Sequence, residues 1–332
     1  MQPFAFSRAK DVQQAIQAGA QASTAQQGAE VRFVAGGTTL VDLMKLDVEQ
    51  PRQVIDINHL PLDRMETLSD GRLKIGALVR NADLAVAPEV ERNYTVLAQA
   101  LRSGASGQLR NMATTGGNLL QRTRCVYFRD TASPCNKREP GSGCPAIEGY
   151  NRNLAILGGS SHCIATHPSD MNVALTVLDA VIVIHGTKGE RSVAIGDFFL
   201  LPGDTPQRET VMEPGDLITH VLLPKPQPRA RSLYLKLRDR SSYEFALASA
   251  AVVADVHEGK IVAARVAMGG IGTRPWRSPE AEHVLAGQAP SPALFERAAQ
   301  ALLADAKPQS QNGFKRELAR RCLVRALTQA TA

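Results

Sequence analysis

Four of the five cysteines of this chain lie within a window of fewer than forty residues, and this clustering constrains the fold more than any other feature. They are Cys125, Cys135, Cys144 and Cys163, separated by gaps of nine, eight and 18 residues. The window is rich in Pro, Gly and Arg and has neither helical nor strand periodicity. We therefore expect an irregular loop that carries thiols.

Three uses of these thiols remain open. None of the gaps is the C-x2-C knuckle typical of structural zinc, and disulfides need an exported chain, for which no export signal is visible. An iron–sulfur cluster requires four cysteines without a fixed close spacing. Four nearby cations would offset its negative charge: Arg122, Arg124, Lys137 and Arg138. The residues thus favour a cluster over zinc, and zinc over unliganded thiols, whereas the distant Cys322 is expected to be a small buried residue of a C-terminal helix.

The order of predicted elements favours an α+β fold over a regular βαβ alternation. Strands are predicted at 31–35, 53–57, 71–79, 216–226, 232–238 and 260–270, with a hairpin at 180–195. Helices are predicted at 11–21, 40–46, 81–101, 167–180, 244–256, from Ser291-Pro292 onward and over 313–331, with a glycine-rich loop at 103–118. The 332 residues suffice for two or three domains, and a shift in composition predicts a boundary near 226–231.

Composition and charge exclude several classes of protein. No run reaches the ~18 apolar residues of a membrane-spanning helix, and the first residues lack the apolar core of a signal peptide and a twin-arginine pair. We therefore expect that a periplasmic location would require export together with a partner. The net charge is +6, but the cations are scattered and aromatic residues make up only 5%, which argues against nucleic-acid binding.

A pair of glycines separates a predicted strand from a predicted helix in the segment VAGGTTL, residues 34–40. Adjacent glycines let the backbone adopt open dihedral angles and approach a ligand closely. The N–H groups at the start of the following helix suit a pyrophosphate, and Thr38 and Thr39 add hydroxyl donors. The motif is neither G-x-G-x-x-G nor a Walker loop, so a plain strand-to-helix turn remains the alternative.

A second glycine pair occurs in TTGGNLL, residues 114–120, and again has hydroxyl and amide neighbours. Two such segments favour one shared anionic ligand, although a glycine-rich surface loop is the simpler reading of either alone. Asp170 can accept a hydrogen bond from a ligand, or it can cap the next helix together with Ser169. Lys236 can place a positive charge near an electron-rich ring, or it can lie on a solvated strand face.

Taken in order, several motifs resemble the FAD-binding subunit of the molybdenum hydroxylases, the xanthine dehydrogenase and aldehyde oxidoreductase family. The motifs are FVAGGTTLVDLMK, IGALVRNADLA, QLRNMATTGGNLL, THPSDM, DLITHVLLP and YLKLRDRSSYEFALASAAV. Ordinary members pass from the G-G-N loop to the S-D pair within a short stretch, whereas here an insertion brings in the cysteines. The pattern RTRC…PCNKR…GSGC…HPSDM is most similar to the flavin subunit of bacterial periplasmic aldehyde oxidoreductase, which carries a [4Fe-4S] cluster in this insertion.

The resemblance implies a role for each matching residue. The backbone N–H groups around the FAD pyrophosphate would belong to Val34, Ala35, Gly36, Gly37, Thr38, Thr39 and Leu40. The second flavin loop would contain Thr114, Gly117 and Asn118, with Leu120 against the ring. Asp170 would contact the FAD, and Ile218 and Lys236 would lie near the flavin. The cluster ligands would be Cys125, Cys135, Cys144 and Cys163, and no residue of this chain would be catalytic.

The implied fold is a two-lobed FAD-binding domain over residues 1–226, followed by a C-terminal α+β domain with antiparallel sheet over 227–332. The lobes would cover about 1–58 and 59–226, with the cysteine-rich insertion at about 121–165.

The implied function is an electron-transfer subunit of a heterotrimeric molybdenum aldehyde oxidoreductase. A large partner would hold the molybdenum cofactor and a small partner the [2Fe-2S] centres, and electrons would reach an external acceptor through the FAD. The complex would be periplasmic by co-export with a signal-bearing partner, and otherwise cytoplasmic. The alternatives are a self-contained FAD-dependent oxidoreductase of similar fold and a zinc-bearing binding module without flavin.

Overall fold

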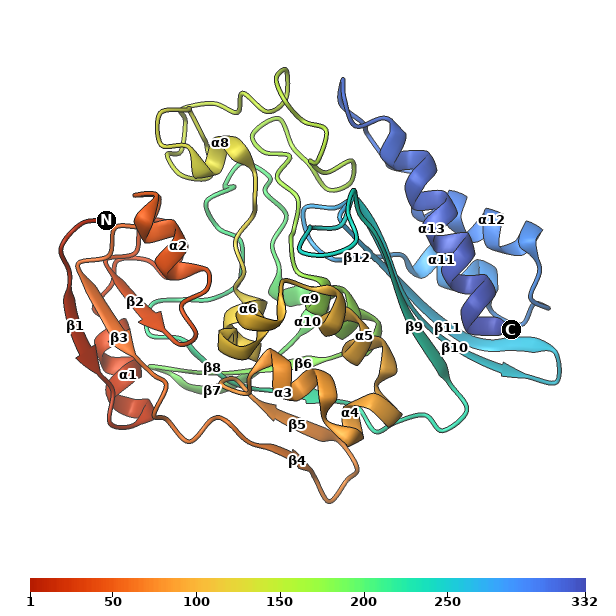
Figure 1. The fold of residues 1–332 in the computed structure, drawn as a ribbon, viewed down its shortest axis with the longest axis horizontal. Coiled ribbons are helices and arrows are strands. Elements are labelled where there is room, and N and C mark those ends of the chain that lie inside the picture. Colours follow the sequence, from red (N-terminus) through yellow and green to blue (C-terminus); the bar gives the residue numbers. More distant parts are fainter.

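The computed structural model describes residues 1–332 and contains three β-sheets arranged along the molecule (Figure 1). Each sheet is built from its own stretch of the chain: the first from residues 5–56, the second from 65–223 and the third from 231–277. Helices and strands are mixed and the third sheet is antiparallel, which agrees with the predicted α+β class. None of the helices combines the length and apolar character needed to span a membrane.

The first lobe is a small parallel sheet in the order β1-β3-β2, with two helices. Its elements are β1 (Ala5–Arg8), α1 (Val12–Gly19), β2 (Val31–Val34), α2 (Leu40–Lys45) and β3 (Gln53–Asp56). The strand β1 lies outside the predicted strands. Asp11 is the actual cap of α1: its carboxylate accepts a hydrogen bond from the N–H of Gln14.

The second lobe is a five-stranded antiparallel sheet covered by helices. Its strands are, in sheet order, β4 (Met65–Thr67), β5 (Leu73–Gly76), β8 (Leu217–Leu223), β6 (Val181–Gly186) and β7 (Gly189–Ala194). Its helices are α3 (Asn81–Val86), α4 (Pro88–Asn93), α5 (Thr95–Ser103), α6 (Gly107–Met112), α7 (Thr115–Leu119), α9 (Asp170–Val177) and α10 (Ile195–Phe198).

Two predictions for the second lobe are wrong. The single helix expected over 81–101 is three helices, because a proline disfavours helical backbone in the preceding residue and Ala87 is extended, with ψ 124°. The loop expected over 103–118 contains α6 and α7, which begin at the side-chain caps Ser106 and Thr114.

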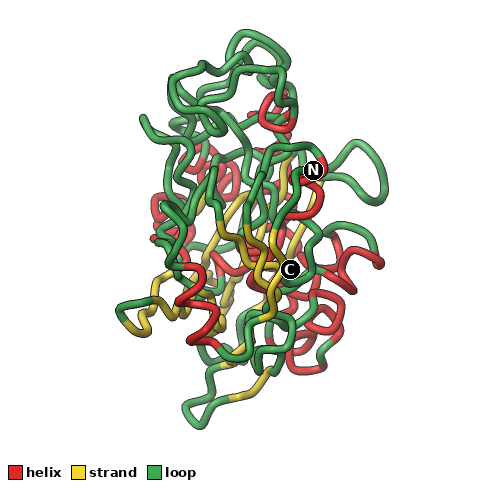
Figure 2. The backbone as a smooth tube through the Cα atoms, turned by 90° about the vertical axis from the view of Figure 1, so that its left-hand side faces the viewer, coloured by secondary structure: helices red, strands yellow, loops and turns green.

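The cysteine-rich segment between α7 and α9 is almost entirely loop. Its one helix is α8 (Val126–Arg129), and Figure 2 shows the segment as the coil at the top of the molecule. It nevertheless forms a small core with Leu43 and Val48 of the first lobe. In this core Phe128, Leu154 and Ile164 pack with three of the cysteines. The irregular loop predicted for this window is thus what the chain forms.

The C-terminal part is an antiparallel sheet in the order β12-β11-β10-β9, backed by three helices. Its elements are β9 (Arg231–Leu237), β10 (Ala248–His257), β11 (Lys260–Gly269), β12 (Trp276–Arg277), α11 (Pro279–Leu285), α12 (Pro292–Leu302) and α13 (Phe314–Thr331). Ser278 and Ser291 cap α11 and α12, each followed by a proline in the first turn.

The helix predicted over 244–256 is wrong, because most of it is the strand β10. Ala250 and Val252 pack into the core shared with α12 and α13, whereas Ala251 and Val253 pack into the core of the second lobe. Both faces of the strand are therefore buried. A strand of this kind lacks the alternation of polar and apolar residues that marks a half-buried strand, so its alanine-rich run resembles a helix.

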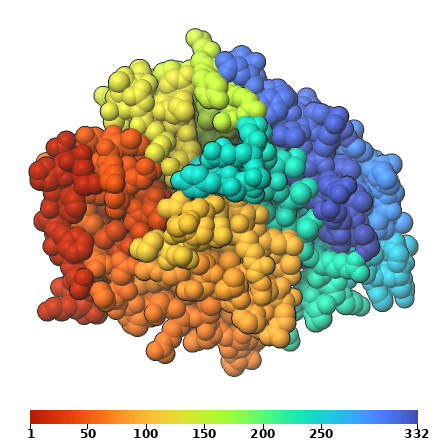
Figure 3. Space-filling view, in the orientation of Figure 1, coloured from red at the N-terminus to blue at the C-terminus, as the bar shows by residue number.

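The C-terminal part also braces the cysteine-rich segment. In the space-filling view, residues around 240 (cyan) lie between that segment (yellow) and the helices near residue 100 (orange) (Figure 3). Arg152 pairs with Asp239 at 2.8 Å, and the guanidinium of Arg124 lies 5.2 Å from the ring centre of Phe245. At the start of α13, the buried Lys315 donates to the carbonyls of Asn153, Leu154 and Gly270.

Candidate functional site

The first glycine pair forms the turn between β2 and α2. Gly37 has φ +71°, a left-handed conformation that residues with a side chain rarely adopt. Its carbonyl accepts the N–H of Val41, so the turn leads directly into α2. Thr39 is the N-cap residue of α2 but makes no side-chain cap bond, which leaves its hydroxyl available to a ligand.

The second glycine pair forms the first turn of α7. The hydroxyl of Thr114 accepts the N–H of Gly117 at 3.2 Å, and the Thr115 hydroxyl donates to the carbonyl of Val79. A Cβ added to Gly116 would lie 3.1 Å from the Cβ of Ala77. This pair is therefore fixed to the second lobe rather than forming a free surface loop.

The first glycine segment packs against the backbone just before the second segment. A Cβ added to Gly36 would lie 1.9 Å from the carbonyl oxygen of Met112 and 2.6 Å from its carbonyl carbon. Only glycine allows this approach between the backbones of the two lobes. No local sequence pattern indicates this contact, because it joins residues more than seventy positions apart.

Both segments line one crevice with a volume of about 260 Å³ between the lobes. Most of the residues predicted to bind FAD lie along it: Val34, Ala35, Gly36, Gly37, Thr38, Thr39, Leu40, Thr114, Gly117, Leu120 and Ile218. Asn118, Asp170 and Lys236 do not line it. Two segments that are far apart in sequence thus meet in one cavity, as a shared ligand would require.

Asp170 and Lys236 instead bind each other at the contact of the second lobe with β9. The ammonium of Lys236 lies 2.7 Å from one carboxylate oxygen of Asp170 and also donates to the carbonyl of Ser103. The other oxygen accepts the Tyr234 hydroxyl, and burial together with this carboxylate raises the pKa of Tyr234 well above its usual value. Asn118 accepts the hydroxyl of Ser169, the N-cap residue of α9.

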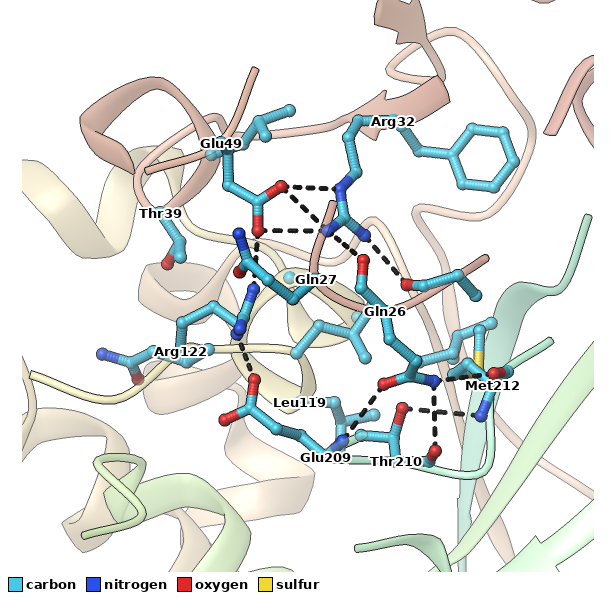
Figure 4. A pocket seen from close by; sticks show the side chains of 18 of the residues that line it. Gln26, Gln27, Arg32, Thr39, Glu49, Leu119, Arg122, Glu209, Thr210 and Met212 are labelled. Atoms are coloured by element: carbon cyan, nitrogen blue, oxygen red, sulfur yellow. Dashed lines mark hydrogen bonds and ion pairs between the residues drawn. The ribbon is translucent and has the colours of Figure 1, made fainter. Parts of the chain in front are cut away.

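A chain of buried charges crosses the crevice (Figure 4), and sequence reasoning missed most of it. Glu49 pairs with Arg32 at 2.8 Å and with Arg122 at 2.6 Å, and Glu209 pairs with Arg122 and, at 3.0 Å, with Lys137. All five line the crevice. In the sequence, Arg122 and Lys137 stand out only as neighbours of the cysteines, and no local pattern links the other three.

These five charged side chains shift one another's pKa values. Burial would raise the pKa of Glu209, but the charges of Arg122 and Lys137 outweigh it and lower the pKa to about 2. Burial would lower the pKa of Arg122, and its two carboxylate partners raise it instead. These five side chains comprise three cations and two carboxylates. In addition, the buried Nη2 of Arg122 has no hydrogen-bond partner. This free donor fits an anionic group in the crevice.

The side chain of His167 is neutral and also lines the crevice. Burial lowers the pKa of His167 to about 4. Its Nε2 lies 2.9 Å from the side-chain amide of Asn172, so Nε2 accepts and Nδ1 carries the proton. The centres of the His167 and Phe199 rings lie 4.7 Å apart, in an edge-to-face arrangement.

The four clustered cysteines line a second, smaller cavity beside the crevice. Cys125, Cys135 and Cys163 are buried, Cys144 is half-buried, and all are free thiols. The N–H of Ala165 lies 3.4 Å from the sulfur of Cys163, and other backbone N–H groups approach Cys125 and Cys144. Such N–H groups stabilise thiolates, so the donor set fits an iron–sulfur cluster.

The same sulfurs are not arranged around a single ion. A zinc ion needs four ligand atoms about 2.0–2.3 Å from one point. No group of three or more His, Cys, Asp or Glu side chains in the structure has an arrangement that could hold one metal ion. Burial raises the pKa of Cys125 to about 12, so without a positively charged ligand this thiol stays protonated. Cys322 is buried on α13, apart from the other four.

Comparison with solved structures supports the fold. The chain of carbon monoxide dehydrogenase from Hydrogenophaga pseudoflava matches 99% of this chain and 98% of its own length, with 25% identity and a TM-score of 0.77. A chain of quinoline 2-oxidoreductase from Pseudomonas putida 86 matches with 22% identity and a TM-score of 0.75, over 99% and 97% of the two chains. The two-lobed fold with a C-terminal antiparallel sheet is therefore confirmed.

Two family models match the chain. The FAD binding domain in molybdopterin dehydrogenase matches residues 2–226, and the CO dehydrogenase flavoprotein C-terminal domain matches residues 232–330. Among curated proteins, the aldehyde oxidoreductase FAD-binding subunit PaoB of Escherichia coli (strain K12) is 50% identical over 313 residues, which cover 94% of this chain and 95% of PaoB. The glyceraldehyde dehydrogenase medium chain of Sulfolobus acidocaldarius is 27% identical over 86% of this chain and 82% of its own. The chain therefore belongs to the FAD-binding oxidoreductase subunits of the molybdenum hydroxylase family.

Proposed function

We propose that this chain is the FAD- and [4Fe-4S]-containing electron-transfer subunit of a molybdenum aldehyde oxidoreductase. It would pass electrons from the [2Fe-2S] centres of a small partner subunit to an external acceptor, while a large partner with the molybdenum cofactor oxidises the aldehyde. The observation that carries this proposal is the 50% identity, over nearly the full length of both chains, to an aldehyde oxidoreductase FAD-binding subunit.

We propose that the FAD lies in the crevice between the lobes. The backbone N–H groups of residues 34–40 would hold its pyrophosphate, because the two glycines keep this backbone uncovered. Thr114 and Gly117 would bind from the second segment, and Leu120 and Ile218 would supply apolar contacts. The bound flavin supplies a carrier that accepts one electron at a time and can hold two.

The proposed flavin contacts of Asn118, Asp170 and Lys236 rest on the family resemblance alone. All three already have partners in this structure: Asn118 binds Ser169, and Asp170 binds Lys236. For Asp170 to contact FAD, a carboxylate oxygen must bind the cofactor in addition to Lys236 or Tyr234. A carboxylate can do this, because its two oxygens together accept about four hydrogen bonds.

We propose that Cys125, Cys135, Cys144 and Cys163 are the ligands of a [4Fe-4S] cluster. The shared cavity, the nearby N–H groups and the lack of disulfides support this ligand set. Arg138 adds support, because it ties the insertion together through the carbonyls of Tyr127 and Phe128. Cys135→Ser should remove the iron while leaving the FAD largely bound, because Cys135 does not line the crevice. Iron at the wild-type level in this variant would refute the ligand assignment.

The domain division at about residue 226 is part of the same proposal. The first family model ends at residue 226 and the second begins at residue 232. No sheet contains strands from both sides of this boundary. The two lobes, at about 1–58 and 59–226, each contain one sheet, and the insertion at about 121–165 contains α8. We also propose a periplasmic location through co-export with a signal-bearing partner, which rests on the resemblance of the cysteine-rich segment.

The visible spectrum of the purified protein separates this proposal from its alternatives. Flavin bands with a broad cluster shoulder, plus iron and acid-labile sulfide, are expected. Flavin bands without iron would favour a self-contained flavoenzyme, and a colourless protein would favour a binding module. Co-purification with two further chains, one of which contains molybdenum, tests the proposed assembly. Fractionation of cells that express all the chains tests the periplasmic location.

A further inference from the structure

The crevice and the cysteine cavity share a wall. Lys137, Cys163 and Ala165 line both cavities. Cys163, one of the proposed cluster ligands, thus also lines the crevice. Cys135, Cys144 and Cys125 line only the cysteine cavity. Lys137 is the only charged residue common to both linings.

The ammonium group of Lys137 is held firmly in this wall. Its Nζ donates to the carbonyl of Pro206 at 2.8 Å and lies 3.0 Å from a carboxylate oxygen of Glu209. The side chain is only 7% exposed. A charge buried to this extent is little screened by salt and acts over a longer range than a surface charge.

The positive charge of Lys137 is only partly neutralised. Glu209 is shared with Arg122, which also binds Glu49, and Glu49 in turn binds Arg32. These five paired side chains therefore include one more cation than anions. Arg122 also reaches the wall, because its guanidinium lies 4.8 Å from the ring centre of Phe128, which lines the cysteine cavity. Lys137 thus places a positive charge at the lining of both cavities, with Arg122 beside it.

We propose that Lys137 raises the reduction potentials of both the flavin and the iron–sulfur cluster, as one fixed charge between them. This inference rests on the proposed function, which places FAD in the crevice and a cluster on the four cysteines. Reduction adds negative charge, so a nearby fixed cation stabilises the reduced form of each group. One residue would thereby keep both groups easily reducible.

The test is a potentiometric titration of the purified complex. The flavin is followed by its visible absorbance and the cluster by electron paramagnetic resonance. In Lys137→Gln both midpoint potentials should fall, and in Lys137→Arg, which keeps the charge, both should stay near the wild-type values. Lys188→Gln is the matched control, since it removes the same charge from an exposed hairpin turn that lines neither cavity. It should leave both potentials unchanged.

Several outcomes would overturn the inference. One is a Lys137→Gln protein with full iron and FAD content in which either potential is unchanged. Another is a Lys137→Arg protein whose potentials fall as far as those of Lys137→Gln. Wild-type protein without iron would instead refute the proposed function, and iron analysis distinguishes the two failures.

A second variant keeps the inference testable if Lys137→Gln loses a cofactor. Glu209→Gln removes the carboxylate that opposes Lys137, so both potentials should rise. Unchanged or lower potentials in Glu209→Gln would overturn the inference. A change of opposite sign from two neighbouring substitutions is an electrostatic result that a merely structural defect would not produce.

Discussion

The close contact between Gly36 and Met112, just before the second glycine segment, makes Gly36→Ala a demanding test of the crevice. The new Cβ would lie 1.9 Å from the Met112 carbonyl oxygen, whereas real Cβ contacts are essentially never under 3.0 Å. The two backbones would have to separate by about 1 Å, and neither is a flexible side chain that can turn away. Forcing extra volume into such a contact costs about 1–3 kcal/mol.

This cost should appear mainly in FAD binding. The lobes can relieve the clash by moving apart, but a dinucleotide held by both segments would pull them together again. If the full cost falls on the bound state, FAD affinity drops by about fivefold to somewhat over a hundredfold, at about 1.4 kcal/mol for each factor of ten. We expect flavin-depleted Gly36→Ala protein, with a higher dissociation constant when FAD is titrated back and its fluorescence is followed.

Gly107→Ala is the matched control for this experiment. Gly107 is the first residue of α6, in the same region, and an added Cβ there meets nothing within 4 Å. The change should be neutral or stabilising by less than about 1 kcal/mol, with FAD binding unchanged. Wild-type FAD affinity in Gly36→Ala, or an equal loss in Gly107→Ala, would refute the view that the Gly36–Met112 contact sets the width of the crevice.

Three further predictions concern other residues. Gly37→Val should lose FAD, because φ +71° is strained for any residue with a side chain and valine is β-branched; full flavin content in the purified variant would contradict this. Asp170→Asn should lower the melting temperature even of FAD-free protein, at a cost of about 3–5 kcal/mol, because it leaves Lys236 buried without its counter-charge; a loss confined to FAD affinity would instead favour a purely cofactor-binding role. Burial lowers the pKa of Lys315 to about 7, below its unfolded value of about 10.4, so the unfolded chain binds more protons between these pH values and this residue makes stability rise with pH. The melting temperature of wild-type protein should therefore rise relative to Lys315→Met from pH 7 to 9, and parallel profiles would refute this.

Local rules predicted much of the fold from the sequence. The hairpin of β6 and β7 turns near Lys188-Gly189 as expected, and the helix after Ser291-Pro292 begins at its serine cap. Where a residue's environment came from another part of the chain, prediction failed. The strand β10 is the clearest case, because its two buried faces belong to two different cores.

The candidate site was likewise predicted only in part from the sequence. Both glycine segments were found from their sequence, because glycine pairs between apolar runs have a local backbone meaning. The partners of Asp170 could not be found, since Lys236 lies 66 positions away and Tyr234 lies on the same distant strand, β9. The charges of Arg32, Glu49 and Glu209 were missed, because isolated charged residues in a sequence are usually solvated.

The sequence alone determined which residues can turn, cap and bind, and it identified the family, because these properties depend on residue types at short spacings and on the order of motifs. Only the tertiary structure decided which of these residues meet. It brought four thiols together across gaps of up to 18 residues and joined Arg122 to Glu49 across 73 positions. The physical reason is that such contacts are formed by the packing of whole lobes, and a buried charge is stable only where that packing supplies its partner.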